Sequence, residues 1–173
     1  MRAFAFWKAV IVDQANLLER FFSLLSVHRI PFCLIGGQGL NAYVEPVVSL
    51  DLDIVIAADR IDDAERLLRK QFTLERFSHS LNVSDAASDL RIQIQLDPRY
   101  APFIERAGTR SVLGLNVPVA AIDDILRGKI WAVTDMSRRG SKRQKDLADI
   151  ARIVECYPDL RSTVPPDVLS RLM

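Results

Sequence analysis

Two carboxylates, Asp51 and Asp53, alternate with apolar residues in the segment LDLDI at residues 50–54. Successive side chains of a β-strand point to opposite faces, so this pattern places both carboxylates on the same face of one strand. Aspartate is uncommon in strands, and two like charges on one face repel each other unless a cation lies between them. Hard oxygen ligands of this kind suit Mg²⁺ or Mn²⁺. The spacing therefore predicts a site for a divalent metal.

A short strand and a glycine pair precede these carboxylates and must position them. The apolar run Phe32–Ile35 has the length of a buried strand, and Gly36 and Gly37 end it. A short helical pattern follows, and Pro46 closes it because a proline ring cannot continue a helical hydrogen-bond ladder. The expected order is strand, Gly-Gly, short helix and Asp-x-Asp strand. A plain strand–helix–strand unit with two surface aspartates is the simpler alternative.

This order resembles the core motif of the nucleotidyltransferase superfamily, the fold of DNA polymerase beta and of the small antibiotic nucleotidyltransferases. The small AbiEii/AbiGii-like proteins are the most similar group. The resemblance implies that the turn of Gly36, Gly37 and Gln38 approaches the phosphates of a nucleoside triphosphate. It also implies that Asp51 and Asp53 are catalytic residues that hold the metal.

Two further positions in this core bear on the resemblance. Ser49 matches the Ser or Thr that usually precedes the Asp-x-Asp strand, and the resemblance assigns it to nucleotide binding. Many members carry an arginine two residues before that Ser or Thr, whereas this chain has Val47. At this position the chain departs from the pattern of the family.

The strand expected at residues 90–96 alternates strictly between polar and apolar side chains. The resemblance implies a third carboxylate on this strand, because nucleotidyl transfer uses two metals to activate the acceptor and to hold the leaving pyrophosphate. Gln93 or Gln95 stands at the expected position, and Gln95 would then contact the nucleotide. Asp97 has the right parity but lies one pleat, roughly 6 to 7 Å, beyond Gln95. Either Asp97 serves as the third catalytic carboxylate or it caps the turn into a helix that is expected at about residues 101–107.

Two helices are expected near the C-terminal end, at about residues 121–135 and 142–157, around a basic loop. They resemble the helical tail of AbiEii-like proteins, in which Lys129, Lys145, Asp146 and Asp149 match the characteristic positions. The resemblance assigns Lys129 and Lys145 to nucleotide binding. The surrounding basic residues would suit a triphosphate or an RNA backbone, although a solvated helix start is the plainer alternative. These residues are Arg138, Arg139, Lys142, Arg143 and Lys145.

The composition is that of an ordinary globular protein, with 49% hydrophobic and 26% charged residues among 173. This length predicts one nucleotidyltransferase-like domain over residues 1–173, with a core at about 30–120 and a helical C-terminal segment at about 121–173. The fold class is α/β, with a mixed sheet flanked by helices. The net charge of +1 gives no overall attraction to nucleic acid, so any charged site must be local.

The N-terminal region predicts an amphipathic helix at about residues 7–28, whose surplus aromatic side chains offer a surface for a homodimer. Charged residues interrupt its apolar start, which argues against a signal peptide. No apolar run approaches the roughly 20 residues of a membrane span. Cys33 and Cys156 have neither the number nor the spacing of a disulfide framework or a zinc site, so a reduced, cytoplasmic protein is expected.

The leading hypothesis is a Mg²⁺-dependent (or Mn²⁺-dependent) enzyme that transfers a nucleoside monophosphate from a nucleoside triphosphate to an acceptor, which is RNA, a protein or a small molecule. Two alternatives remain. The glutamines at the third-carboxylate position and the absent arginine favour a catalytically reduced member that binds a nucleotide or a partner. The similarity to AbiEii-like proteins also suggests the toxin of a toxin–antitoxin pair.

Overall fold

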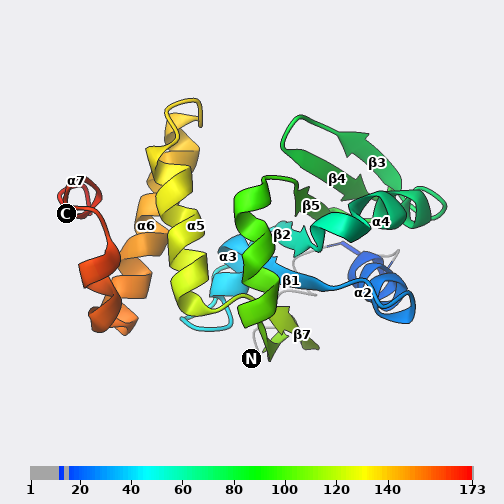
Figure 1. The fold of residues 1–173 in the computed structure, drawn as a ribbon, viewed down its shortest axis with the longest axis horizontal. Helices are drawn as coiled ribbons and strands as arrows, with labels where there is room; N and C mark the ends of the chain where they lie inside the picture. The colour runs from blue at the N-terminus through cyan, green and yellow to red at the C-terminus, as the bar shows by residue number, and fades with distance from the viewer. Residues whose placement is uncertain (1–11, 14–15, 173) are drawn as a thin grey trace.

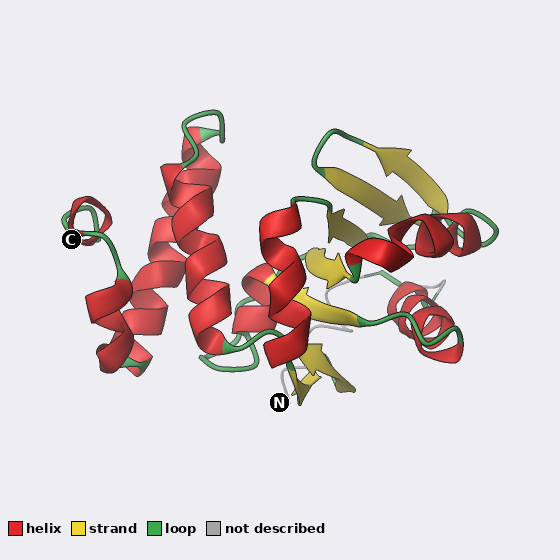
Figure 2. Ribbon diagram, in the orientation of Figure 1, coloured by secondary structure: helices red, strands yellow, loops and turns green. Residues whose placement is uncertain are grey.

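The computed structural model describes residues 12–13 and 16–172, and within them seven strands form one mixed sheet in the order β3-β4-β5-β2-β1-β7-β6 (Figures 1 and 2). The predicted α/β class, with a mixed sheet and flanking helices, is confirmed. The strands are β1 (Phe32–Ile35), β2 (Asp51–Ile56), β3 (Thr73–Arg76), β4 (Ser80–Ser84), β5 (Arg91–Gln95), β6 (Gly108–Val112) and β7 (Leu115–Val119).

Helices lie around this sheet, and α5 and α6 form an antiparallel pair beside it, on the left of Figure 1. Within the described residues, no helix is both long and apolar enough to cross a membrane. The α-helices are α2 (Leu17–Val27), α3 (Gly36–Leu40), α4 (Ile61–Leu68), α5 (Ile122–Thr134), α6 (Gly140–Cys156) and α7 (Pro166–Leu169), and the 3₁₀-helices are η1 (Ala58–Arg60), η2 (Pro98–Arg106) and η3 (Pro158–Thr163).

The pairing of the central strands determines which residues lie opposite one another in the sheet. β1 runs antiparallel to β2, with Ile35 opposite Asp53, and parallel to β7 on its other side. β2 in turn runs parallel to β5. Leu52 and Ile54 of β2 are buried in the core, and the side chains of Asp51 and Asp53, which alternate with them, point to the other face.

The helix expected from about residue 7 begins at Leu17 as α2, and residues 7–11 and 14–15 lie outside the described part. Its aromatic side chains belong to the core: Phe22 stacks on Phe32 of β1 with ring centroids 5.4 Å apart, and Phe21 lies against Phe72 at 6.4 Å. The aromatic side chains of α2 therefore already pack against their own chain. The homodimer stays a prediction.

Two helices differ from expectation for identifiable local reasons. α3 ends at Leu40, well before Pro46, because the Asn41 side chain bonds to both backbone groups of Val47 and turns the chain away. The helix expected at about residues 101–107 is the 3₁₀-helix η2, which begins at Pro98 and contains Pro102. Proline lacks the backbone donor that an α-helix needs at that point.

Candidate active site

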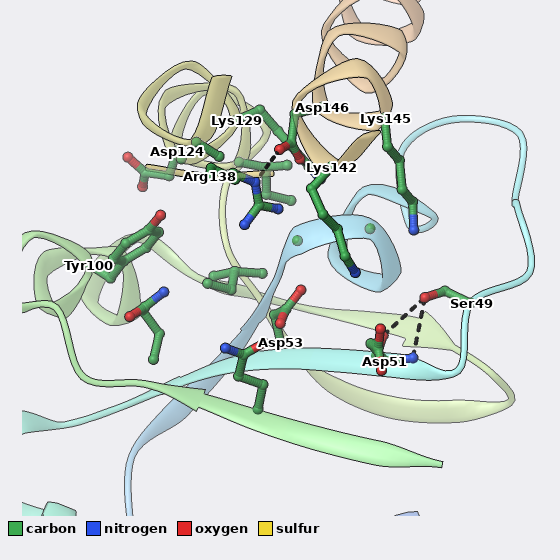
Figure 3. Close-up of a pocket in the computed structure, with 18 of the residues that line it drawn as sticks. Ser49, Asp51, Asp53, Tyr100, Asp124, Lys129, Arg138, Lys142, Lys145 and Asp146 are labelled. Carbon is green, nitrogen blue, oxygen red and sulfur yellow. Dashed lines mark hydrogen bonds and ion pairs between the residues drawn. The ribbon is translucent and has the colours of Figure 1, made fainter. Parts of the chain in front are cut away.

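A cavity of about 240 Å³ opens above the polar face of β2, between the sheet and the α5–α6 pair. Figure 3 shows Asp53 near its middle, with Ser49 and Asp51 toward one end and Tyr100 at the other. The residues that line it come from the β1–α3 turn, β2, β5, η2, α5 and α6. The cleft thus unites segments that are far apart in the sequence, from Ile35 to Asp146.

Gly36 is required where the chain passes beside Asp53. Its φ angle is +65°, in the left-handed region that other residues rarely adopt. A Cβ atom at Gly36 would meet Asp53 Oδ2 well inside van der Waals contact, whereas one at Gly37 would have nothing within 4 Å. The first glycine therefore lets the backbone approach the carboxylate. Both glycines line the cavity.

The two carboxylates have different surroundings. Burial raises the pKa of Asp53, and the nearby charge of Lys129 only partly offsets this effect. Asp51 lies nearer the rim, and its Oδ1 forms an ion pair at 3.1 Å with Nε of Arg91, the residue opposite it on β5. A desolvated carboxylate next to a second carboxylate favours a bound cation. The pair therefore has the character of a metal site.

Gln93, rather than Gln95, lies opposite Asp53 in the parallel register, and Gln95 lies opposite Val55. Both glutamines line the cavity. The Oε1 atom of Gln95 accepts hydrogen bonds from the backbone amides of residues 96 and 97, at 3.1 and 3.2 Å. Of the two positions considered for the third carboxylate, the register therefore favours that of Gln93.

Asp97 is outside the set of residues that line the cavity. Its side chain caps η2 by accepting a hydrogen bond from the Arg99 amide at 3.0 Å, and it forms an ion pair with the Arg99 side chain at 2.7 Å. These contacts lower the pKa of Asp97, with the Arg99 side-chain hydrogen bond as the main cause. They account for Asp97 as a helix cap, which was the second possibility from the sequence.

The loop between α3 and β2 carries Ser49 into the cavity lining. Gln38 is fully buried, and its Nε2 donates to the Ser49 carbonyl at 2.9 Å while its Oε1 accepts from Asn41 at 3.0 Å. Ser49 Oγ accepts a hydrogen bond from the Asp51 amide at 3.3 Å. Gln38 therefore holds the loop through its hydrogen bond to Ser49. Gln38 itself, which the sequence assigned to nucleotide binding, is not among the residues that line the cavity.

Lys129 lines the cavity but is held by two carboxylates of α6. Its Nζ lies 3.0 Å from Asp146 Oδ1 and 2.7 Å from Asp149 Oδ2, and its side chain is 10% exposed. Desolvation lowers the pKa of Lys129, but Asp149 and Asp146 outweigh this effect and the net pKa is raised. Lys129 therefore remains charged and joins α5 to α6.

The predicted basic cluster divides between residues that line the cavity and residues that do not. Arg138, Lys142 and Lys145 line the cavity, whereas Arg139 and Arg143 do not. Figure 3 shows Lys142 and Lys145 extending from α6 toward the side of Ser49 and Asp51. Arg138 Nε also forms an ion pair with Asp146 at 2.7 Å. The exposed side chains of Lys142 and Lys145 are the cations best placed to meet an anionic ligand.

Sequence reasoning missed the end of the cleft that is formed by η2 and α5. Tyr100 lines the cavity, and its ring packs edge-on against Phe103 and Trp131 with centroids 5.3 and 5.1 Å apart. Burial raises the pKa of Tyr100 to about 12. Asp124 is buried and paired with Arg106 at 2.7 Å. An aromatic residue soon after the capping Asp97 was the only available signal, and it does not specify a site.

The residues fit a metal ion that is shared with a ligand better than one enclosed by protein. Within the described ranges, no group of three or more His, Cys, Asp or Glu side chains is placed to hold a metal. Mg²⁺ is commonly bound by one or two carboxylates together with substrate phosphates and water. Asp51 and Asp53 satisfy that requirement, and Lys142 and Lys145 face the same space.

Solved structures with a similar fold are nucleotidyltransferases, although their low sequence identity supports the fold alone. ANT(2″)-Ia in complex with adenylyl-2″-tobramycin has a TM-score of 0.64 at 11% identity, covering 92% of this chain and 99% of that one. Lincomycin-bound LnuA, a lincosamide antibiotic adenylyltransferase, has 0.55 at 12%, covering 82% and 99%. An antigenic nucleotidyltransferase-like protein from Paracoccidioides brasiliensis has 0.55 at 17%, covering 94% of each chain.

None of the curated proteins compared by sequence matches this chain. A protein family does match, over residues 17–172, and it is described as nucleotidyl transferase AbiEii toxin, type IV toxin–antitoxin system. The match covers the Gly-Gly turn, the Asp-x-Asp strand and the α5–α6 pair, and so includes the whole cleft. The resemblance seen in the sequence is confirmed: this protein belongs to the AbiEii nucleotidyl transferase family.

Proposed function

We propose that this protein transfers a nucleoside monophosphate from a nucleoside triphosphate to an acceptor, with Mg²⁺ or Mn²⁺ held by Asp51 and Asp53. The observation that carries the proposal is the pair of carboxylates on one face of β2, with Lys142 and Lys145 across the cavity. A triphosphate would use both features, because a metal held by the carboxylates would neutralise part of its charge and the lysines would neutralise the remainder.

In the proposed reaction, an acceptor oxygen forms a bond to the α-phosphorus, and the bond from that phosphorus to the bridging oxygen breaks. Pyrophosphate leaves toward Lys142 and Lys145, roughly in line with the attacking oxygen. Gly36 and Gly37 bring backbone close to the phosphates, and Ser49 lies beside them. The metal, when bound, stabilises charge on the phosphate oxygens. Lys129 is assigned to holding α6 in place, because two carboxylates already neutralise its charge.

The register of β5 supports a second candidate, a member with reduced catalysis. Gln93 lies opposite Asp53, where a third carboxylate would help to hold a second metal. A neutral amide is a poor ligand for Mg²⁺, and loss of that metal would leave the acceptor hydroxyl weakly activated. This candidate predicts triphosphate binding with slow transfer. The family description also supports a toxin of a toxin–antitoxin pair. Such a toxin would modify RNA or another protein, and the identity of the acceptor decides between these two.

Two measurements test the proposal. Calorimetry with MnCl₂ and a non-hydrolysable nucleoside triphosphate should give heat with the wild type and little or none with the Asp51→Asn/Asp53→Asn double variant. Incubation of cellular RNA and protein with α-labelled nucleoside triphosphates should then transfer label in a metal-dependent way. Equal binding heats from both proteins would falsify the assigned site, whereas binding without label transfer would select the candidate with reduced catalysis.

A further inference from the structure

A series of charged groups connects α5 to the loop that carries Ser49. Lys129 of α5 contacts Asp149 of α6 at 2.7 Å, and Asp149 in turn contacts Nη1 of Arg152 at 2.9 Å. The second terminal nitrogen of Arg152 donates a hydrogen bond to the backbone carbonyl of Glu45. Glu45 lies on the loop between α3 and β2, so this chain of contacts crosses from the helical pair to the edge of the cleft.

The same loop is fastened from its other side by neutral amides. Gln38 of α3 donates to the Ser49 carbonyl at 2.9 Å, and Asn41 bonds to the carbonyl and amide of Val47 at 2.8 and 3.0 Å. These contacts tie the loop to α3 and the sheet. Arg152 ties this loop to α6 at Glu45, and Tyr157, which caps the end of α6, ties it again by donating a hydrogen bond to the Tyr43 carbonyl at 3.1 Å. The Arg152 side chain is 25% exposed, so the guanidinium is largely shielded from solvent.

α6 also carries two of the cations that line the cleft. Lys142 and Lys145 line the cavity from the first half of the helix, and Arg152 lies farther along it. A helix is stiff over this length, so fastening one part of it to the loop sets where the rest lies. The contact between Arg152 and Glu45 is, of the two ties to this loop, the one nearer to the lysines along α6, so it contributes to the separation between the two lysines and Ser49.

We propose that Arg152 is a positioning residue for the triphosphate end of the cleft. It holds α6, with Lys142 and Lys145, at a fixed separation from the loop that presents Ser49 and leads into Asp51. This inference rests on the proposed function for its ligand, because a triphosphate chain is what would touch both sides. Groups that orient ligand-binding residues typically change affinity by 10- to 100-fold when they are removed.

The test uses inorganic tripolyphosphate with MnCl₂ as the calorimetric probe, because it contains the phosphates without an unknown base. Arg152→Met keeps most of the side-chain volume and removes the donors, while Asp149 keeps its contact with Lys129. We expect the Kd to rise roughly 10-fold in Arg152→Met and to recover in part in Arg152→Lys. Arg161→Met, on the exposed surface of η3, is the control and should bind as the wild type does.

Hydrogen exchange of the ligand-free protein gives a second readout that needs no binding. The backbone amides of residues 45–50 should exchange faster in Arg152→Met, while those of the central strands stay protected. A role in general stability would instead speed exchange throughout. An unchanged Kd in Arg152→Met, measured where it is fully folded, would overturn the inference. If the wild type itself fails to bind tripolyphosphate, the proposed function fails, and unchanged exchange at residues 45–50 then refutes the role of Arg152 separately.

Discussion

Asp53 of β2 lies directly opposite Gln93 of β5 in the parallel pair, so the cross-strand neighbour of this carboxylate is a neutral amide. This relationship makes position 93 the place at which a substitution can add negative charge beside Asp53. An aspartate there would bring a third carboxylate to the Asp51–Asp53 pair, and three carboxylates can hold a second divalent ion.

Gln93→Asp is therefore expected to tighten Mn²⁺ binding by calorimetry and to raise any nucleotidyl transfer. Gln95→Asp is the matched control, because Gln95 lies opposite Val55 and its Oε1 is used by backbone amides. It should leave Mn²⁺ binding near the wild-type value. A stronger effect from Gln95→Asp than from Gln93→Asp would contradict the register argument.

The Asp97→Asn variant distinguishes a helix-capping role of Asp97 from a catalytic one. Loss of the charged cap and its ion pair with Arg99 should cost roughly 1 kcal/mol of stability, while Mn²⁺ binding and transfer stay at wild-type levels. Thermal unfolding and calorimetry on the same sample provide both values. Transfer that is present in the wild type and abolished in Asp97→Asn would show instead that Asp97 is the third carboxylate.

Gly36→Ala should disturb the metal site, whereas Gly37→Ala should not. An added Cβ at Gly36 overlaps Asp53 Oδ2, and the left-handed backbone there adds a cost of about 1–2 kcal/mol for an L-residue. We expect a lower unfolding temperature together with weaker Mn²⁺ binding. Gly37 has open space around the corresponding position. Equal Mn²⁺ affinity in the two variants would argue against a close approach of Gly36 to Asp53.

Asp53→Asn should stabilise the metal-free protein at neutral pH. Burial raises the pKa of Asp53 above its ordinary value of 3.8, so the native state retains a proton that the unfolded chain has already released. The free energy of unfolding of the wild type therefore falls as the pH rises from 3.8 through the raised pKa. The Asp53→Asn variant does not lose this stability as the pH rises. Each kcal/mol by which its free energy of unfolding exceeds that of the wild type corresponds to roughly 2–4 °C in Tm.

The gain in Asp53→Asn should vanish when both proteins are compared below pH 3.8, where the wild-type carboxyl is protonated in both states. Saturating MnCl₂ at pH 7 should raise the Tm of the wild type but not that of the variant. Thermal scans across pH, with and without the metal, check both statements. A variant that is less stable than the wild type at neutral pH without metal would contradict the assignment.

Lys129→Met should destabilise the fold severely, because it leaves Asp146 and Asp149 with less compensation in a buried setting. Removing one partner of a buried ion pair costs roughly 3–5 kcal/mol, and the Lys129 side chain is 10% exposed. Lys142→Met removes an exposed lysine of the same cleft and should leave the unfolding temperature nearly unchanged while weakening triphosphate binding. Denaturant unfolding of the two variants compares these effects directly.

The alternation of residues along the chain was enough to predict which side chains share a face of the sheet, but not their register. Asp51 and Asp53 point to one face because a strand has a period of two. A shift of β5 by two residues would keep that parity, so the sequence left Gln93 and Gln95 equivalent. Only the pairing of the strands in space places Gln93 opposite Asp53.

Contacts between side chains of distant segments likewise could not be predicted from local sequence patterns. The sequence indicated that Lys129 and the basic loop could meet a phosphate. Lys129 lines the cavity, as do three of the five basic residues, Arg138, Lys142 and Lys145. No sequence pattern indicated that Asp146 and Asp149 would enclose the Lys129 ammonium, or that Gln38 would bond to the carbonyl of Ser49. These contacts depend on how the helical pair and the loop pack against each other.

The order of the chain also determines when the cleft can exist during synthesis. The carboxylates of β2 emerge from the ribosome early, whereas β7, the parallel neighbour of β1, and the lysines of α6 follow much later. Domains fold as their residues become available, at about 5–20 residues per second. A nascent chain therefore carries the acidic half of the cleft for several seconds before the basic half is made. If the proposed function holds, the protein cannot bind a triphosphate until α6 has packed against α5, and a nascent chain that lacks α6 does not transfer nucleotides.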